Sequence, residues 1–268
     1  MPHERRPAAF FDLDKTVIAG SSALALARPF RDGGLLTRGA ALRGLYAQLG
    51  YLSFGADHDR TERMKGRLAA LSRGWDAEQT AEVVAGALER YIRPVVYAEA
   101  LDLVAEHQRA GHDVVVVSAS SETVVRPIAG LLGADHVIAT RPVIAEGRYT
   151  GELDFYAYGP AKATAIAELA AACGYDLATS HAYSDSLTDL PMLEAVGHPV
   201  AVNPDRALRR HARAQGWPVR TFARPVAPRQ ARFPAVATLA AAAALSAAGA
   251  WAWGRYARER GDRPLPAR

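Results

Sequence analysis

The sequence predicts an α/β fold built on a doubly wound parallel sheet, with a helical insertion after the first strand and a hydrophobic helix near the C-terminus. Short apolar runs alternate with helical patterns of about 10–15 residues over most of the chain, which is typical of βαβ units. A purely helical pattern over residues 20–93 interrupts this alternation. A 22-residue segment without a charged side chain, residues 233–254, gives the last helix.

Composition limits the class of protein. The 268 residues, half of them hydrophobic, suffice for one large domain or two smaller ones. A single cysteine, Cys173, excludes an internal disulfide framework and fits a reducing compartment. Residues 1–9 contain no apolar run, so no secretory signal is expected. Residues 1–202 carry 19 basic and 25 acidic side chains, whereas residues 203–268 carry 13 and 3, so the C-terminal part favours an anionic partner.

The first expected elements are a buried strand and the helical insertion. Ala8 to Phe11 form an apolar run that predicts the strand. Leucine and phenylalanine then recur at helical spacing from Leu24 to Leu52. Two further helices are expected over residues 57–71 and 76–91, each with an aspartate at its N-cap.

The alternation of strands and helices resumes at Pro94. Val114 to Val117 are all β-branched, which predicts a strand buried on both faces. The other strands are expected over residues 136–139, 181–183 and 199–202. Residues 141–154 are expected to form a hairpin that turns at Glu146-Gly147. Helices are expected over residues 95–109, 122–132, 160–173 and 205–215.

The stretch Phe10-Phe11-Asp12-Leu13-Asp14-Lys15-Thr16 organises the predicted site. Open α/β sheets bind ligands beyond the carboxyl ends of their strands, where Asp12 and Asp14 fall. On a continuing strand the two carboxylates would point the same way and repel each other unless a cation lay between them. Such a pair predicts Mg²⁺, and Mg²⁺ bound by carboxylates predicts a phosphate. The alternative is a surface turn with two solvated aspartates.

Polar residues also follow three later elements. They are Ser118, Lys162 at a helix start, and Ser184, Asp185 and Asp189. Each has a structural alternative: Ser118 as a helix N-cap, Lys162 as a solvated lysine, and Asp189 as a helix N-terminal charge. A lysine in the first turn of a helix opposes the helix dipole, and the chain has only three lysines against 29 arginines, so Lys162 is expected to be functional.

The order of these residues resembles the haloacid dehalogenase-like superfamily of phosphatases over residues 8–220. Ser118-Ala119-Ser120-Ser121-Glu122 and Ala201-Val202-Asn203-Pro204-Asp205 resemble its phosphoserine phosphatase-like subgroup. The resemblance implies a Rossmann-like catalytic core formed by residues 1–19 and 94–223. Residues 20–93 would form a helical type 1 cap.

The resemblance also implies a role for each residue of the motifs. Asp12 would be the nucleophile that forms an aspartyl-phosphate, and Asp14 the general acid and base. Asp12, the backbone carbonyl of Asp14 and the side chain of Asp185 would bind Mg²⁺. The expected phosphate-binding residues are Thr16, Ser118, Lys162 and Ala119, whose amide is expected at the N-terminus of the following helix. Asp189 and Asn203 would orient the metal ligands without binding the ion themselves.

Three positions depart from the phosphoserine phosphatase pattern. No carboxylate follows the first motif until Asp32, so a substrate ammonium group lacks the acidic residue that usually binds it. Lys15 stands where serine is common, and Ser184 replaces a glycine. These departures weaken the phosphoserine assignment and leave the reaction class unchanged.

The C-terminal segment predicts a membrane anchor. A helix over residues 233–254 would be about 33 Å long, enough to cross a hydrocarbon core of roughly 30 Å. Trp251 and Trp253 lie at one end of it, and arginines flank both ends. Residues 224–232 would be a linker and residues 255–268 a basic tail. The alternative is an Ala-rich soluble helix, because eleven of the 22 residues are alanine.

The sequence therefore predicts a Mg²⁺-dependent phosphomonoester hydrolase acting on a small-molecule or lipid phosphate. Its catalytic domain is expected in the cytoplasm, anchored to the cell membrane, with no nucleic-acid partner. Three alternatives remain open: a phosphoserine phosphatase, a phosphotransferase and a catalytically silent membrane-tethered binding protein.

Overall fold

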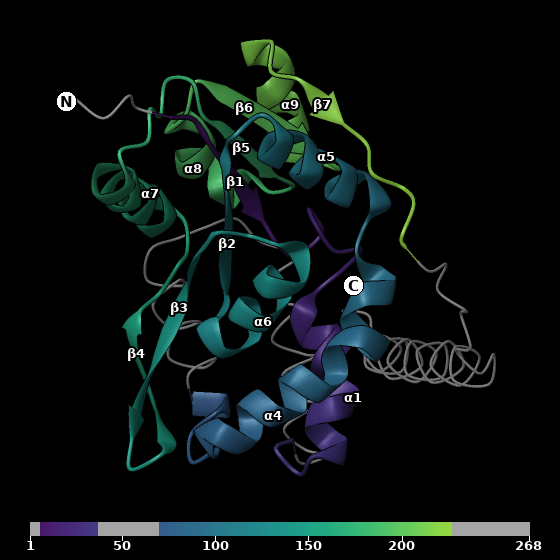
Figure 1. Ribbon diagram of the computed structural model, residues 1–268, viewed down its shortest axis with the longest axis vertical. Helices are drawn as coiled ribbons and strands as arrows, with labels where there is room; N and C mark the ends of the chain where they lie inside the picture. The colour runs from purple at the N-terminus through teal and green to yellow at the C-terminus, as the bar shows by residue number, and fades with distance from the viewer. Residues whose placement is uncertain (1–5, 37–69, 227–268) are drawn as a thin grey trace, which may run out of the picture. The chain divides into compact units, whose positions relative to one another are not determined.

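The computed structural model describes residues 6–36 and 70–226 of the chain (Figure 1). The strands are β1 (Ala8–Asp12), β2 (Asp113–Ser121), β3 (His136–Ala145), β4 (Arg148–Phe155), β5 (His181–Ser184), β6 (His198–Val202) and β7 (Val219–Arg220). The α-helices are α1 (Ser22–Asp32), α4 (Ala77–Ala87), α5 (Ala98–Arg109), α6 (Glu122–Leu132), α7 (Pro160–Cys173), α8 (Leu190–Glu194) and α9 (Arg206–Gln215). Shorter helical turns span Leu88–Ile92, Arg93–Val95 and Leu187–Asp189.

The strands form one sheet in the order β4-β3-β2-β1-β5-β6-β7. Every neighbouring pair is parallel except the hairpin β3–β4. The chain adds β2 and β3 on one side of β1 and then returns to place β5 on the other side. The carboxyl ends of β1 and β5 therefore form the topological switch point, where α/β sheets bind ligands. The predicted parallel α/β fold is confirmed.

Helices cover both faces of the sheet, as expected for a doubly wound fold. Helices α5 and α6 pack on the face that carries Ala9 and Phe11 of β1, together with α1 and α4. Helices α7, α8 and α9 pack on the face that carries Ala8 and Phe10 (Figure 1). All five residues of β1 are buried, because strands lie on both sides of it and helices on both faces.

The described part of the insertion is helical. Helix α4 begins after Asp76, whose side chain accepts hydrogen bonds from the backbone N–H groups of Glu78 and Gln79, so the predicted N-cap is confirmed. The helix expected over residues 57–71 lies almost wholly outside the described residues. The role of residues 20–93 as a cap stays a prediction.

The hairpin β3–β4 ties the sheet to the insertion. Glu146 and Gly147 form its turn with φ values of 51° and 75°, as the sequence predicted. The backbone of Tyr149 accepts a hydrogen bond from Gly74 at 2.8 Å and donates one to Trp75 at 3.0 Å. The segment before α4 is therefore bonded to the edge of β4.

The structure corrects three details of the prediction. The strand of the first motif ends at Asp12, and the chain then turns, because the N–H groups of Val17 and Ile18 both bond the carbonyl of Leu13. Strand β2 continues beyond Val117 to Ser121, with an irregularity in its pairing to β3 between Ser118 and Ser121. The two-residue strand β7 was not predicted, since so short a segment leaves no periodic signal.

The predicted membrane helix, residues 233–254, lies outside the described residues, as does the tail at 255–268. Of the linker at 224–232, only residues 224–226 are described. Among the residues that are described, no helix combines the length and the apolar character needed to cross a membrane.

We expect acid to destabilise the fold through His107. Burial, with His181, His112 and Arg220 nearby, lowers the pKa of His107 to about 4 from 6.5. Between these values the unfolded chain binds a proton that the folded chain does not, so the free energy of unfolding falls as pH decreases. The expected loss from this group is about 2 kcal/mol between pH 7 and pH 5.

Urea unfolding at both pH values, in the presence of EDTA, measures this loss. His107→Gln, which cannot titrate in this range, should lose less stability than the unaltered protein on acidification. Equal losses in the two proteins would assign the acid sensitivity to other groups.

Candidate active site

Strand β1 delivers Asp12 to the carboxyl edge of the sheet, and the turn that follows is tight. Lys15 lies in the left-handed region, with φ of 63°, and its N–H bonds the carbonyl of Gly20 at 2.8 Å. This closed loop brings Asp14 and Thr16 back beside the end of β1. Thr16 is fully buried, and its hydroxyl finds no hydrogen-bond partner among the described residues. A buried, unpaired hydroxyl is costly unless a ligand satisfies it.

A buried lysine bridges two buried carboxylates at the centre of the site. The ammonium of Lys162 lies 2.7 Å from Oδ1 of Asp12 and 2.8 Å from Oδ1 of Asp189. Lys162 is 2% exposed and stands in the first turn of α7. Burial alone would lower the pKa of Lys162, but the two carboxylates offset it and raise the pKa, so the ammonium keeps its charge.

Burial and two neighbouring carboxylates together outweigh the effect of Lys162 on the pKa of Asp12. Burial raises the pKa of Asp12 well above its ordinary value, Lys162 acts in the opposite direction, and the charges of Asp189 and Asp185 raise it further. Asp185 follows β5 directly, and burial raises its pKa to about 7, with Lys15 lowering it and Asp189 raising it. The site thus gathers buried carboxylates beside one buried ammonium group.

Asp189 is positioned from two sides. Its Oδ2 accepts a hydrogen bond from the hydroxyl of Ser184 at 2.7 Å, and both of its oxygens lie near Lys162. Asp189 therefore orients the lysine that contacts Asp12. The structure brings Asp189, Lys162, Asp12 and Asp185 together, and their catalytic roles stay predictions.

Asp14 is held between the insertion and strand β2. Its Oδ1 accepts a hydrogen bond from the N–H of Ser22 at 2.6 Å, and its Oδ2 accepts one from the hydroxyl of Ser120 at 3.2 Å. The hydroxyls of Ser22 and Ser120 also lie 3.0 Å apart. Burial raises the pKa of Asp14, although the hydrogen bonds act against it, which favours the protonated form that a general acid needs.

Sequence reasoning missed Ser22 and Ser120 as site residues. Ser120 follows Ser118 by two positions, so on a strand that continues to Ser121 both residues lie on one face. The two-residue spacing from Ser118 was the signal from which Ser120 could have been predicted. Ser22 contacts Asp14 through its backbone N–H as well as approaching Ser120 through its hydroxyl, and the sequence holds no signal for the backbone contact.

Ser118 and Ala119 lie within strand β2. Ser118 is 1% exposed, and its Oγ accepts a hydrogen bond from the N–H of Ser120 at 3.1 Å, a contact that does not use the hydroxyl proton. The expectation that the amide of Ala119 lies at a helix N-terminus is wrong, because α6 begins at Glu122. The carbonyl of Ala119 accepts a hydrogen bond from Thr140 at 2.7 Å.

Asn203 does not join the cluster through its amide. Its Oδ1 accepts a hydrogen bond from the N–H of Phe222 at 3.0 Å, and its Nδ2 donates one to the carbonyl of Phe222 at 2.9 Å. The residue stands at the end of β6 with φ of 45°. Its side chain fixes the chain after β7, so the expectation that Asn203 supports the metal ligands gains no support from these contacts.

The chemistry of the donors fits a magnesium ion. Asp12 and Asp185 supply carboxylate oxygens at the switch point, and the backbone carbonyl of Asp14 lies in the same loop. Mg²⁺ prefers such oxygen ligands and pairs with phosphate oxygens. Burial, and beside it the charge of Asp189, raises the pKa values of Asp12 and Asp185, and a bound dication would favour the ionised form of both.

Comparison with known proteins gives consistent findings. The family described as haloacid dehalogenase-like hydrolase matches residues 9–194. The chain is 56% identical over 253 residues to an inhibition of morphological differentiation protein of Streptomyces azureus, covering 92% of this chain and 91% of that protein. It is 55% identical over 237 residues to a probable phosphatase of Mycobacterium tuberculosis, covering 88% and 82%.

A solved structure resembles the fold. It is a protein of unknown function from Bordetella pertussis, with a TM-score of 0.72 and 31% sequence identity, and the match covers 81% of this chain and 99% of that one.

Proposed function

Because the chain belongs to the haloacid dehalogenase-like hydrolase family, we propose that it hydrolyses phosphomonoesters with transient phosphorylation of Asp12. The observation that carries this proposal is the buried bridge from Asp12 through Lys162 to Asp189, beside Asp185. A nucleophilic carboxylate must be ionised, and Lys162 favours that form at 2.7 Å. The family and the complete set of carboxylates favour a hydrolase over a silent binding protein.

Asp12, Asp185 and the carbonyl of Asp14 would hold Mg²⁺ in this proposal. When bound, the ion supplies positive charge that offsets the carboxylates and the phosphoryl oxygens.

The protein's own groups account for both chemical steps. A carboxylate oxygen of Asp12 attacks phosphorus, the ester P–O bond breaks, and the proton of Asp14 passes to the leaving oxygen. Water then attacks phosphorus, gives its proton to the Asp14 carboxylate, and breaks the bond to Asp12, which releases phosphate. Both aspartates return to their starting state.

Four groups would bind the phosphoryl oxygens. They are the hydroxyls of Thr16 and Ser118, the amide of Ala119 and the ammonium of Lys162. The position of Lys162, whose ammonium lies 2.7 Å from Oδ1 of Asp12, supports this assignment most directly.

The substrate we propose is a small-molecule or lipid phosphate. Asp32, the first carboxylate after the motif, lies at the end of α1 and pairs with Arg28 and Arg31 on the surface. Asp32 is therefore already paired with arginines. Within the described part of the insertion, it offers no free negative charge near Asp14 to bind the ammonium group of a substrate. The apolar segment at residues 233–254 is the reason to include lipid phosphates and anchoring at a membrane.

The test is phosphate release by the full-length protein from a panel of phosphomonoesters, in Mg²⁺ or in EDTA. The panel sets lysophosphatidate and phosphatidylglycerophosphate beside phosphoserine and soluble sugar phosphates, and added alcohols detect transfer to an acceptor other than water. We expect Mg²⁺-dependent release, strongest for a substrate without an ammonium group. Preference for phosphoserine would contradict the substrate proposal alone. No release from any ester, by protein shown to be folded, would favour the silent binding protein.

A further inference from the structure

A group of histidines lies at the edge of the sheet opposite the proposed active site. His181 begins β5 and His112 directly precedes β2, whereas Asp12 ends β1 and Asp185 follows β5. His107 reaches the same place from the last turn of α5. The proposed phosphatase chemistry uses none of these rings.

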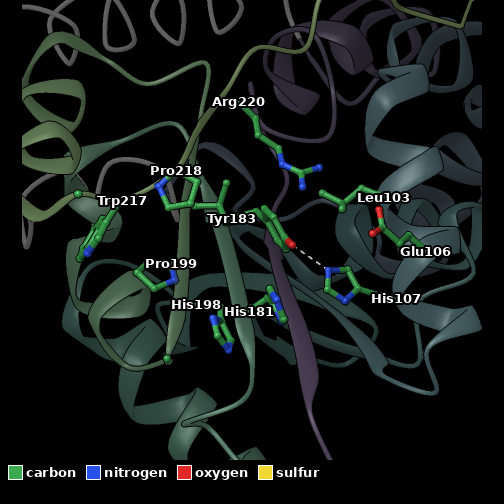
Figure 2. Close-up of a pocket in the computed structure, with 13 residues that line it drawn as sticks. Leu103, Glu106, His107, His181, Tyr183, His198, Pro199, Trp217, Pro218 and Arg220 are labelled. Atoms are coloured by element: carbon green, nitrogen blue, oxygen red, sulfur yellow. Dashed lines mark hydrogen bonds between the residues drawn. The ribbon is translucent and has the colours of Figure 1, made fainter.

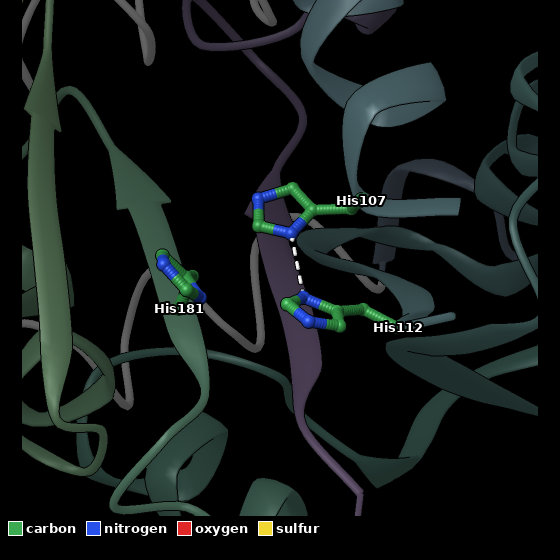
Figure 3. Close-up of side chains that lie close together, drawn as sticks. All are labelled: His107, His112 and His181. Atoms are coloured by element: carbon green, nitrogen blue, oxygen red, sulfur yellow. Dashed lines mark hydrogen bonds between the residues drawn. The ribbon is translucent and has the colours of Figure 1, made fainter. Parts of the chain in front are cut away.

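The three rings lie within the spacing of metal ligands. One ring nitrogen of each histidine lies within 4.8 Å of one ring nitrogen of both others. Nδ1 of His107 and Nδ1 of His112 are 2.9 Å apart, and the ring of His181 lies across β1 from them (Figure 3). Two nitrogens bound to one tetrahedral zinc ion at about 2.0–2.1 Å lie roughly 3.3 Å apart. The Nδ1 atoms of His107 and His112 are near this spacing, and nitrogens up to 4.8 Å apart would have to move closer on binding.

His181 carries a ring nitrogen that is buried and unsatisfied. Its Nδ1 is buried and has no hydrogen-bond partner among the described residues. A buried polar atom without a partner costs about 1–3 kcal/mol, and coordination to a cation would remove that cost. This observation is independent of the spacing of the three rings.

The sheet explains why the rings can meet. Ala9 of β1 pairs with Val114 of β2 on one side and with His181 of β5 on the other. Its small side chain belongs to the core on the α5 face. A methyl group at this position leaves room above β1 for the ring of His181 from β5 and for the ring of His112, which directly precedes β2.

The surroundings of His107 and His181 favour the neutral form of both rings, which can donate a lone pair to a metal ion. Burial lowers the pKa of His107 and of His181, and the neighbouring histidines lower both further. A neutral imidazole is the form that binds a metal. The charged groups that face the rings are Arg220, which opposes a cation, and Glu106, which favours one.

A hydrogen bond and a cavity complete the arrangement. The hydroxyl of Tyr183 lies 2.8 Å from Nε2 of His107 and can accept a hydrogen bond from Nε2–H, which leaves the lone pair on Nδ1 (Figure 2). A metal ion bound to that lone pair would replace the hydrogen bond between Nδ1 of His107 and Nδ1 of His112. A cavity of about 430 Å³ adjoins His107 and His181 and is lined by Glu106 and Arg220 as well. It has room for water or the Glu106 carboxylate as a fourth ligand.

We propose that His107, His112 and His181 bind one zinc-type divalent metal ion at the amino edge of the sheet. Three imidazole nitrogens suit Zn²⁺, Cu²⁺ and Ni²⁺ and bind Mg²⁺ poorly. The ion would join α5, β2 and β5 far from Asp12. The competing explanation is that the three rings pack against their neighbours without binding a metal ion. His181, for example, also stacks on His198, with 4.6 Å between the ring centroids.

The test is Zn²⁺ titration of full-length, chelator-treated protein against a chromophoric competitor, with excess Mg²⁺ present to occupy the active-site carboxylates. We expect one equivalent of Zn²⁺ to bind. His112→Ala and His181→Ala should each weaken binding by more than about 100-fold, since loss of even an outer partner costs 10–100-fold. The matched control His211→Ala removes a histidine of α9 outside the group and should leave affinity unchanged.

Co²⁺ absorption provides a readout that needs no variant. Tetrahedral coordination by nitrogen gives intense visible bands, whereas octahedral oxygen coordination gives weak ones. Asp185→Asn should leave Zn²⁺ affinity and the Co²⁺ spectrum unchanged, which separates this site from the proposed phosphatase site. Absence of Zn²⁺ binding, or equal affinity in the His112→Ala protein, would show that the rings only pack.

Discussion

Asp12→Asn is expected to lower Mg²⁺-dependent phosphate release by at least about 10⁴-fold, the scale of loss when a catalytic nucleophile is removed. The amide keeps the size of the side chain and an oxygen that can accept from Lys162 at the 2.7 Å contact. It cannot form the phosphorylated intermediate. The loss should therefore fall on turnover, with the fold retained in thermal unfolding.

Protein labelling with ³²P-substrate separates the roles proposed for Asp12 and Asp14. The unaltered protein should carry a base-labile label, and Asp12→Asn should carry none. Asp14→Asn serves as the control: with an aryl phosphate, whose leaving group needs no acid, it should become labelled and discharge the label slowly. Full turnover by Asp12→Asn would falsify the assignment of the nucleophile.

The second large effect is expected for Lys162→Met, which should destabilise the protein by about 3–5 kcal/mol and abolish phosphate release. Methionine fills a similar volume but leaves Asp12 and Asp189 without the buried ammonium that lies 2.7 and 2.8 Å from them. Breaking a buried ion pair on one side leaves uncompensated charge, which is why the cost is high. Urea unfolding in EDTA measures it.

A double variant distinguishes the structural from the catalytic part of this effect. Lys162→Met with Asp189→Asn removes one charge of each sign and should recover much of the lost stability. Phosphate release should stay absent, because the ammonium group that contacts Asp12 and would bind the phosphoryl group is then missing. Recovery of activity together with stability would reduce Lys162 to a structural residue.

The sheet and its helices could be predicted because local signals and tertiary structure agree. Helices α6 and α7 match their predicted ends, since glycines at 133 and 174 adopt the left-handed conformation that ends each helix. The residues brought together at the switch point, Asp12, Lys162 and Asp185, are those at strand and helix ends, whose position follows from topology.

The missed features depend on individual hydrogen bonds to the backbone and on the packing of separate elements. The turn after Asp12 is fixed by hydrogen bonds to the carbonyl of Leu13, and Asn203 is engaged by the backbone of Phe222. Neither contact leaves a pattern in the sequence. The histidine group was invisible for the same reason, because His107 and His181 meet only when α5 and β5 pack beside β1.

The central position of β1 also has a consequence for the order of folding during synthesis. Ala8 pairs with Asp113, and Ala9 pairs with His181, so the partners of the first strand follow it by 105 and 172 positions. At about 5–20 residues per second, the ribosome needs roughly 10–30 s to reach β5 after β1. Until then the apolar strand Ala8–Asp12 has one edge unpaired in the nascent chain, which makes it a natural target for chaperones.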